Sequence, residues 1–285
     1  MWWLLGAATL LVIGWGIVSS RTVLYPGLLD IPAPVPPPAF ATAALTARDG
    51  ASFDVWVLAP QAAPRGHLLV FHGYYANRYQ VLAVAHGLRE RGYEVMLIEL
   101  RGHGRRPGPC TLGVREADDA DVVLAWAAAR AQPGDAPLGV LGLSMGGAVA
   151  CQVAARHPEI RVVVVDSLYG RLFPVLAEAI RTERHLPPIP FAWLTWWSLE
   201  LALRRRLGPL DPNALAPRLR QPLLAIQGGA DRRVSSSVSR AFYDRWAGPK
   251  QYWFEPDVAH VGMFPRDPAQ YLERVGAFLD RTMGA

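Results

Sequence analysis

The sequence has few of the residues that mark several common classes of protein. Lysine occurs once, at Lys250, so arginine carries the formal net charge of +5. No arginine stripe and no recognised nucleic-acid module accompanies this charge, so we predict no nucleic-acid partner. Cys110 and Cys151 are the only cysteines, too few to define a disulfide framework or a redox compartment. No internal repeat and no metal-ligand spacing occurs, so we predict no metal site.

Charged side chains are also absent from residues 1–20, which include Trp2, Trp3 and Trp15. An apolar stretch of roughly 20 residues is long enough to cross the hydrocarbon core of a bilayer as a helix. A cleaved signal peptide is the alternative, but the stretch has no basic start and no small-residue cleavage site. We therefore predict a retained single-pass transmembrane anchor at residues 1–20. Arg21, just after it, weakly favours a cytoplasmic catalytic domain.

Proline is concentrated in residues 26–38, so residues 21–40 are predicted to form an extended, semi-rigid linker. Beyond the linker, short apolar runs alternate with helix-like segments over residues 41–285, which predicts one α/β domain with a mostly parallel sheet and helices on both faces. Two runs that flank Asp49-Gly50 predict a hairpin. The expected strands are 41–47, 52–58, 67–71, 94–99, 138–141, 161–166, 222–227 and 251–255, and the expected helices are 78–91, 114–130, 146–156, 236–246 and 267–283.

One stretch interrupts this alternation, at about residues 168–210. It contains Trp193, Trp196 and Trp197, followed by three arginines at 204–206. A connection this long predicts an inserted helical cap over the strand ends. Its aromatic side chains either shape an apolar substrate pocket and touch a membrane, or only seal the cap onto the body of the domain.

The most informative motif is Gly142-Leu143-Ser144-Met145-Gly146, which directly follows an apolar run. It matches G-x-S-x-G, in which a strand turns sharply into a helix and lifts a serine hydroxyl above the sheet. Glycines are needed on both sides because the tight turn has no room for Cβ atoms there. The motif therefore predicts Ser144 as a nucleophile.

A serine hydroxyl needs a histidine to take its proton and an acid to orient that histidine. With chain order serine, acid, histidine, the predicted acid is Asp231, directly after the strand expected at 222–227. Asp166, at the end of the preceding strand, is the alternative acid. His260 is the predicted base, because it is the only histidine that follows Asp231.

Acyl transfer also needs hydrogen-bond donors for the oxyanion. One predicted donor is the backbone N–H of Met145, the residue after the nucleophile. The second is the backbone N–H of Tyr74, in the loop His72-Gly73-Tyr74 after a strand, with Tyr75 as the alternative. His72 itself is predicted to shape the loop by a hydrogen bond.

Together these residues resemble the α/β-hydrolase superfamily over about residues 41–283. Within it, the stretches at 72–73, 101–104, 142–147, 165–167 and 228–231 look like those of membrane-anchored bacterial serine hydrolases described as lysophospholipase-like or monoacylglycerol-lipase-like. The resemblance implies hydrolysis of an ester, thioester or amide through an acyl-enzyme, without a cofactor, and location at the bacterial inner membrane. The two tyrosines after His72-Gly73 depart from the family's usual loop, which has small or polar residues there.

The sequence therefore predicts a membrane-tethered serine esterase that acts on a lipid or another apolar acyl ester. Acyltransferase, peptidase or perhydrolase activity on the same three residues is the alternative, as is a membrane-attached binding protein without activity. Haloalkane dehalogenation is disfavoured because that chemistry needs a carboxylate in place of Ser144. The oligomeric state does not follow from the sequence.

Overall fold

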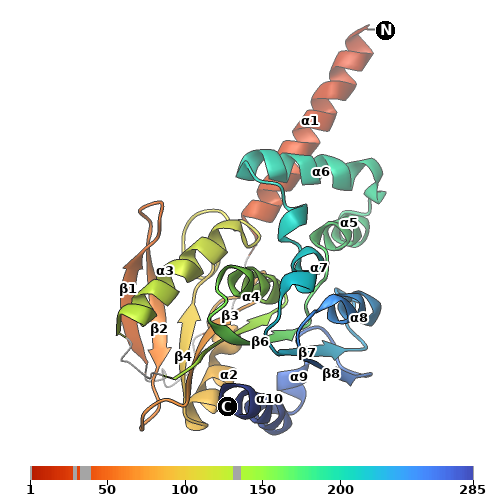
Figure 1. Cartoon of the computed structure of the whole chain (residues 1–285). Coiled ribbons are helices and arrows are strands. Elements are labelled where there is room, and N and C mark those ends of the chain that lie inside the picture. The colour runs from red at the N-terminus through yellow and green to blue at the C-terminus, as the bar shows by residue number, and fades with distance from the viewer. Residues whose placement is uncertain (1, 28–30, 33–39, 131–135, 285) are drawn as a thin grey trace.

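The structure is a computed structural model that describes residues 2–27, 31–32, 40–130 and 136–284 (Figure 1). Within the N-terminal helix, side chains are described at Trp3 and from Val12 onward. Eight strands form one sheet in the order β1-β2-β4-β3-β5-β6-β7-β8. Strand β2 is antiparallel to both of its neighbours, and the other pairs are parallel. The strands are β1 (Ala41–Thr46), β2 (Ser52–Leu58), β3 (Gly66–Phe71), β4 (Tyr93–Ile98), β5 (Leu138–Leu143), β6 (Ile160–Asp166), β7 (Leu223–Gly228) and β8 (Lys250–Glu255).

Helices cover both faces of this sheet, as the apolar strand runs predict. One face packs against α3 (Val114–Arg130), α4 (Met145–Arg156) and α8 (Ser236–Arg245), and the other against α2 (Tyr79–Glu90), the short α9 (Met263–Arg266) and α10 (Pro268–Met283). Successive residues of a strand point to opposite faces. In β3, Leu69 and Phe71 accordingly join the first core while Leu68 and Val70 join the second.

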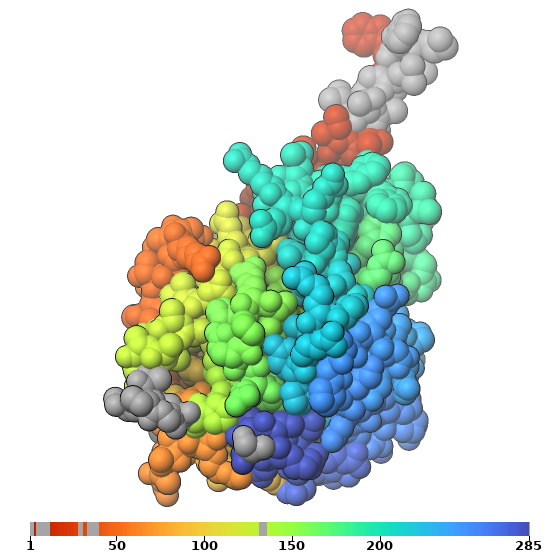
Figure 2. Space-filling view, viewed as in Figure 1, coloured from red at the N-terminus to blue at the C-terminus, as the bar shows by residue number. Residues whose placement is uncertain are grey.

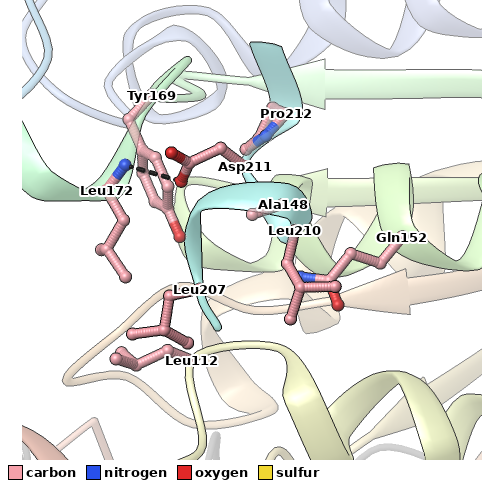
Figure 3. Close-up of a pocket in the computed structure, with 9 residues that line it drawn as sticks. All are labelled: Leu112, Ala148, Gln152, Tyr169, Leu172, Leu207, Leu210, Asp211 and Pro212. Carbon is pink, nitrogen blue, oxygen red and sulfur yellow. Dashed lines mark hydrogen bonds between the residues drawn. The ribbon is translucent and has the colours of Figure 1, made fainter. Parts of the chain in front are cut away.

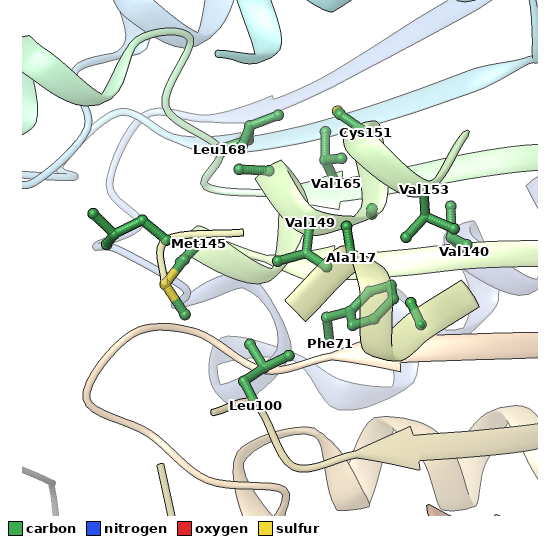
Figure 4. Close-up of a cluster of buried hydrophobic side chains, with 14 of the residues drawn as sticks. Phe71, Leu100, Ala117, Val140, Met145, Val149, Cys151, Val153, Val165 and Leu168 are labelled. Atoms are coloured by element: carbon green, nitrogen blue, oxygen red, sulfur yellow. The ribbon is translucent and has the colours of Figure 1, made fainter. Parts of the chain in front are cut away.

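Helix α4, which follows the G-x-S-x-G motif, lies in the first of these cores. Its Val149 and Val153 pack with Val140 of β5 and Val165 of β6 (Figure 4). All four side chains are fully buried or nearly so. Replacing such a side chain with alanine typically costs about 2–5 kcal/mol of stability. The start of α4 is thus fixed relative to the sheet.

The segment between β6 and β7 is helical, as the sequence predicts for the cap. It contains α5 (Leu172–Glu183), α6 (Pro188–Leu203), a short 3₁₀ turn and α7 (Pro212–Leu215). In the space-filling view, α5 and α6 form the teal and green surface at the end of the molecule from which the N-terminal helix emerges (Figure 2).

The N-terminal helix α1 (Trp2–Leu24) runs past residue 20 and takes in the first residues of the predicted linker. Among the described residues, no helix is both long enough and apolar enough to span a membrane. The side chains at 2 and 4–11, on which much of the predicted anchor depends, are outside the described part, so the anchor stays a prediction. Most of the predicted linker, at 28–30 and 33–39, likewise lies outside the described residues.

Candidate active site

Ser144 stands on a strained turn between β5 and α4. Its φ of 52° and ψ of −116° place a non-glycine residue in a conformation that L-residues rarely adopt. Close packing of the flanking glycines makes this turn possible. A Cβ on Gly142 would collide with the Gly146 carbonyl oxygen, and one on Gly146 would collide with backbone oxygens of Phe71 and His72. The half-buried serine is therefore held at the strand end, with the N-terminus of α4 directly after it.

The structure brings the three predicted polar residues into one hydrogen-bonded chain. His260 Nε2 lies 3.0 Å from Ser144 Oγ, and His260 Nδ1 lies 2.7 Å from Asp231 Oδ2. A carboxylate only accepts hydrogen bonds, so the contact with Asp231 places the His260 proton on Nδ1. Nε2 is then free to accept the hydroxyl proton of Ser144.

Asp231 itself is held by its own loop. Its side chain is fully buried, and Oδ1 accepts hydrogen bonds from the backbone N–H groups of Arg233 and Val234, both at 2.8 Å. Gln227 Nε2, at the end of β7, donates to Oδ2 at 3.2 Å. These donors fix the orientation of the carboxylate toward His260.

Asp166, the alternative acid, does not contact His260. Its Oδ1 accepts a hydrogen bond from Ser167 Oγ at 2.9 Å, and the same Ser167 oxygen accepts one from the Val261 N–H at 2.9 Å. Burial raises the pKa of the Asp166 carboxyl to about 6, against the opposing effects of Ser167 and of His260. Asp166 therefore supports the loop that carries His260 from behind, while Asp231 makes the direct contact.

The loop after β3 lies beside Ser144. A Cβ on Gly73 would be 3.6 Å from the Cβ of Ser144. The Tyr75 N–H donates to His103 Nε2 at 3.3 Å, whereas among the described residues the Tyr74 N–H has no acceptor. Burial and the neighbouring His72 lower the pKa of His103 to about 4, so its Nε2 stays an acceptor at neutral pH. The free donor of this loop is thus Tyr74 and not Tyr75.

His72 shapes this loop as predicted. Its Nδ1 donates to the Gly73 carbonyl oxygen at 2.8 Å, and its Nε2 accepts the Leu100 N–H at 3.1 Å. Both ring nitrogens are therefore occupied by backbone groups. His72 is fully buried, so it has no part in proton transfer at Ser144.

The inner end of α1 packs directly on the same loop, which the sequence did not predict. The Tyr74 hydroxyl donates to the Val23 carbonyl oxygen at 2.7 Å. One residue further on, the Leu24 carbonyl oxygen accepts the Cys110 N–H at 2.7 Å, and the Leu24 side chain is buried in the core. The tyrosine that departs from the usual family loop is thus the residue that holds α1 in place.

A small cavity lies between α4 and the cap (Figure 3). Its volume of about 10 Å³ is room for roughly one water molecule, so it is not a substrate pocket. Within the described ranges, no group of three or more His, Cys, Asp or Glu side chains is placed to hold a metal ion. The lining residues are Leu112, Ala148, Gln152, Tyr169, Leu172, Leu207, Leu210, Asp211 and Pro212.

Solved structures share this architecture. An esterase of Pyrococcus furiosus, Pf2001, superposes with a TM-score of 0.70 at 22% identity, covering 90% of this chain and 98% of that chain. Residues 62–185 match the family described as serine aminopeptidase, S33. This chain has the α/β-hydrolase fold.

Relatives of this α/β-hydrolase include a monoacylglycerol lipase of Mycolicibacterium smegmatis. The two are 29% identical over 231 residues, which cover 68% of this chain and 80% of the lipase. The protein YqkD of Bacillus subtilis is 25% identical over 226 residues, or 78% of this chain and 73% of that protein. Taken with the esterase structure, the match to the lipase favours a hydrolase of the esterase type.

Sequence reasoning missed the supporting residues of this α/β-hydrolase site. Gln227 donates a hydrogen bond to Asp231. Ser167 accepts one from the Val261 N–H in the loop that carries His260, and His103 accepts one from the Tyr75 N–H. Ser167 has a φ of 56°, but no local pattern indicates that its hydroxyl meets residue 261. Only their places at the end of β7, directly after β6 and in the loop after β4, where such sites gather, could have drawn attention to them.

Proposed function

We propose that this chain is a membrane-tethered serine esterase that cleaves lipid-like or other apolar acyl esters. The observation that carries the proposal is the continuous chain from Ser144 Oγ through His260 to Asp231, with distances of 3.0 and 2.7 Å, on a strained strand-to-helix turn. Strain at a half-buried serine that faces a histidine is typical of an activated nucleophile.

In this mechanism Ser144 Oγ attacks the ester carbonyl carbon while its proton passes to His260 Nε2. The electron pair of the C=O π bond moves onto the carbonyl oxygen. The resulting oxyanion accepts hydrogen bonds from the backbone N–H groups of Met145 and Tyr74, and each such donor typically stabilises the transition state by about 3 kcal/mol. Asp231 stabilises the imidazolium. As the ester C–O bond breaks, His260 gives the proton to the leaving alkoxide, and an acyl-enzyme remains on Ser144.

Water then reverses these steps. His260 Nε2 takes a proton from the water as its oxygen attacks the acyl carbon, and the second tetrahedral intermediate collapses with return of that proton to Ser144 Oγ. The products are the acid and the free enzyme. The chain from Ser144 to Asp231 supplies every proton transfer in this cycle, so the proposed reaction uses no cofactor.

The lipid-like substrate is supported by the match to a monoacylglycerol lipase. The membrane attachment is supported by the uncharged stretch at residues 1–20 and by the protrusion of α1 from the body. A tether of this kind would hold the enzyme at the bacterial inner membrane, where such esters are found. Hydrolysis of peptides is a second candidate, favoured by the description of the matched family as serine aminopeptidase.

The first test exposes the detergent-solubilised protein and its Ser144→Ala variant to a fluorophosphonate and measures intact mass. We expect one adduct on the wild type and none on the variant. Labelling of both, or of neither while the fold is intact, would overturn the assignment of Ser144. The labelled enzyme would then be screened on p-nitrophenyl esters of rising chain length and on aminoacyl amides, and faster turnover of the amides would favour the peptidase.

A further inference from the structure

Helix α6 is apolar on every side, but the protein covers only one of them. Ala192, Thr195 and Leu199 are fully buried against the body. On the opposite side, Trp193, Trp197 and Leu201 follow at intervals of four and share one helix face, and Ile189 lies at the kink that precedes it. These side chains, here called the α6 outer face, are Ile189, Trp193, Trp197 and Leu201, with exposed fractions of 72%, 43%, 57% and 80%. A helix that is apolar all round is normally buried or in contact with lipid.

Helix α6 lies across α1 at the point where α1 leaves the body (Figures 1 and 2). A Cβ on Gly16 would collide with Ser198 Oγ, so the two helices cross in close contact there. Trp15 Nε1 donates to the Phe191 carbonyl oxygen at 3.4 Å, and Thr195 Oγ1 donates to Ser19 Oγ at 2.7 Å. These contacts fix α6 across α1, and the exposed side chains of α1 near this crossing are also apolar: Val12, Ile13, Ile17 and Val18.

The surrounding charge is positive. Residues 178–206 contain five arginines and three glutamates and no lysine or aspartate. Glu178 pairs with Arg181, and Glu200 pairs with Arg206. Across the part of the chain that the structure describes, Arg204 and Arg205 at the end of α6 have no carboxylate partner. Exposed arginines beside tryptophan are typical of surfaces that meet anionic lipid headgroups.

We propose that the α6 outer face docks into the surface of an anionic phospholipid bilayer beside the point where α1 enters it. The proposal rests on the proposed role of α1 as an anchor. About 14 residues of α1 precede the crossing at Gly16, a length of about 21 Å. Interfacial helices sink roughly 5–10 Å below the headgroups. Together these lengths match the hydrocarbon core of about 30 Å.

The docked face would also place a groove of the cap where a lipid acyl chain can enter it. Between Trp193 and Trp197 lies an open apolar groove of about 260 Å³. Its other lining residues are Ile189, Pro190 and Leu194. An acyl chain that leaves the bilayer would meet this groove first, because it lies on the side of the cap that faces the membrane in this arrangement.

The test places one spin label at a time on the full chain in vesicles of phosphatidylcholine and phosphatidylglycerol. The labelled variants are Leu201→Cys on the α6 outer face, Ile13→Cys on α1 and Phe254→Cys as the control, a residue exposed by 43% on β8. Both native cysteines are buried, so they do not react. Collisions with oxygen and with an aqueous nickel complex report the depth of each label.

We expect the labels at 201 and 13 to be shielded from nickel and accessible to oxygen, and the label at 254 to be open to nickel. A label at 201 as open to nickel as that at 254, with the label at 13 shielded, would overturn the docking and leave the anchor. If 13 and 201 are both open to nickel, anchor and docking both fail. Spin–spin broadening at 201, which would show a second copy on this face, would also overturn the docking.

Activity provides an independent measurement. The change Leu201→Glu, on the α6 outer face but outside the groove, should reduce hydrolysis of a long-chain monoacyl ester in vesicles by about tenfold or more, and leave hydrolysis of soluble p-nitrophenyl butyrate unchanged. The control Phe254→Glu should change neither rate. Equal rates on vesicles for Leu201→Glu and wild type would contradict the proposal, whereas absence of butyrate hydrolysis in wild type would contradict the esterase function itself.

Discussion

The loops that hold Ser144 and the cap that lies near them are built by opposite means. Around Ser144, Asp231 and His260, polar groups are buried and paired: Asp231 alone accepts four hydrogen bonds. On α6, large apolar side chains are left exposed, although the Trp193 ring also packs against Phe173 of α5. The first region satisfies its groups internally and can fix a reacting geometry, while the second needs an outside partner. Chemistry and location should therefore be separable by mutation.

The largest effect should come from removing the nucleophile. Ser144→Ala leaves His260 without a hydroxyl to activate, so hydrolysis of p-nitrophenyl butyrate should fall by about 10⁵-fold. The depth of a spin label at 201 should not change, since the α6 outer face is untouched. Residual activity within about tenfold of the wild type would show that the nucleophile lies elsewhere.

The next largest contrast is between the two aspartates at neighbouring strand ends. Asp231→Asn should reduce kcat by about 10⁴-fold, because an amide favours the wrong His260 tautomer. Asp166→Asn should reduce kcat by less than about tenfold, because Asp166 reaches His260 only through Ser167 and the backbone of Val261. The measurement is kcat on butyrate ester for both variants. A larger loss for Asp166→Asn would reverse the assignment of the acid.

We expect Asp166 to affect the pH dependence of the free energy of unfolding rather than kcat. Its carboxyl ionises near 3.8 when unfolded, and burial raises its pKa to about 6 in the folded protein. Between these values the folded state keeps a proton that the unfolded state has lost, so stability falls as the pH rises through this window. At pH values above this window, the buried ionised carboxylate lowers the free energy of unfolding by an amount on the order of 3 kcal/mol.

Asp166→Asn carries no ionisable group and avoids this cost. Relative to wild type, its free energy of unfolding in urea should therefore rise as the pH goes from about 4 to about 7. A difference between variant and wild type that is the same at both pH values would contradict the raised pKa of Asp166.

The smallest predicted effect tests the link between the two regions. Tyr74→Phe removes the hydrogen bond to the Val23 carbonyl oxygen, which is worth about 1 kcal/mol. Because the Tyr74 N–H is a proposed oxyanion donor, kcat should fall by about three- to tenfold with KM little changed. Tyr243→Phe is the matched control, since that hydroxyl donates to the Lys250 carbonyl oxygen away from the site. Equal losses in both variants would show a general effect on stability rather than on the oxyanion loop.

Much of the fold could be predicted because its signals are local. Apolar runs bounded by helix-like segments placed the strands to within one or two residues, and the G-x-S-x-G turn is fixed by glycine contacts inside one loop. The predicted hairpin around Asp49-Gly50 forms, with β1 and β2 paired antiparallel. The choice between Asp231, the predicted acid, and Asp166, the alternative, rests on a weaker signal, because both lie at the ends of strands and the path of the loop that carries His260 decides which is in contact.

By itself the sequence determined the order of elements and the apolar character of α1 and α6, and it predicted Ser144 and His260 as nucleophile and base, since these depend on side-chain pattern along the chain. Only the tertiary structure decided that Asp231 and not Asp166 meets His260, that Tyr74 and not Tyr75 keeps a free N–H, and that α1 ends on Tyr74. Each of these depends on a contact between residues 28 to 51 positions apart. Such contacts arise when the packed sheet brings loop ends together, which no local pattern records.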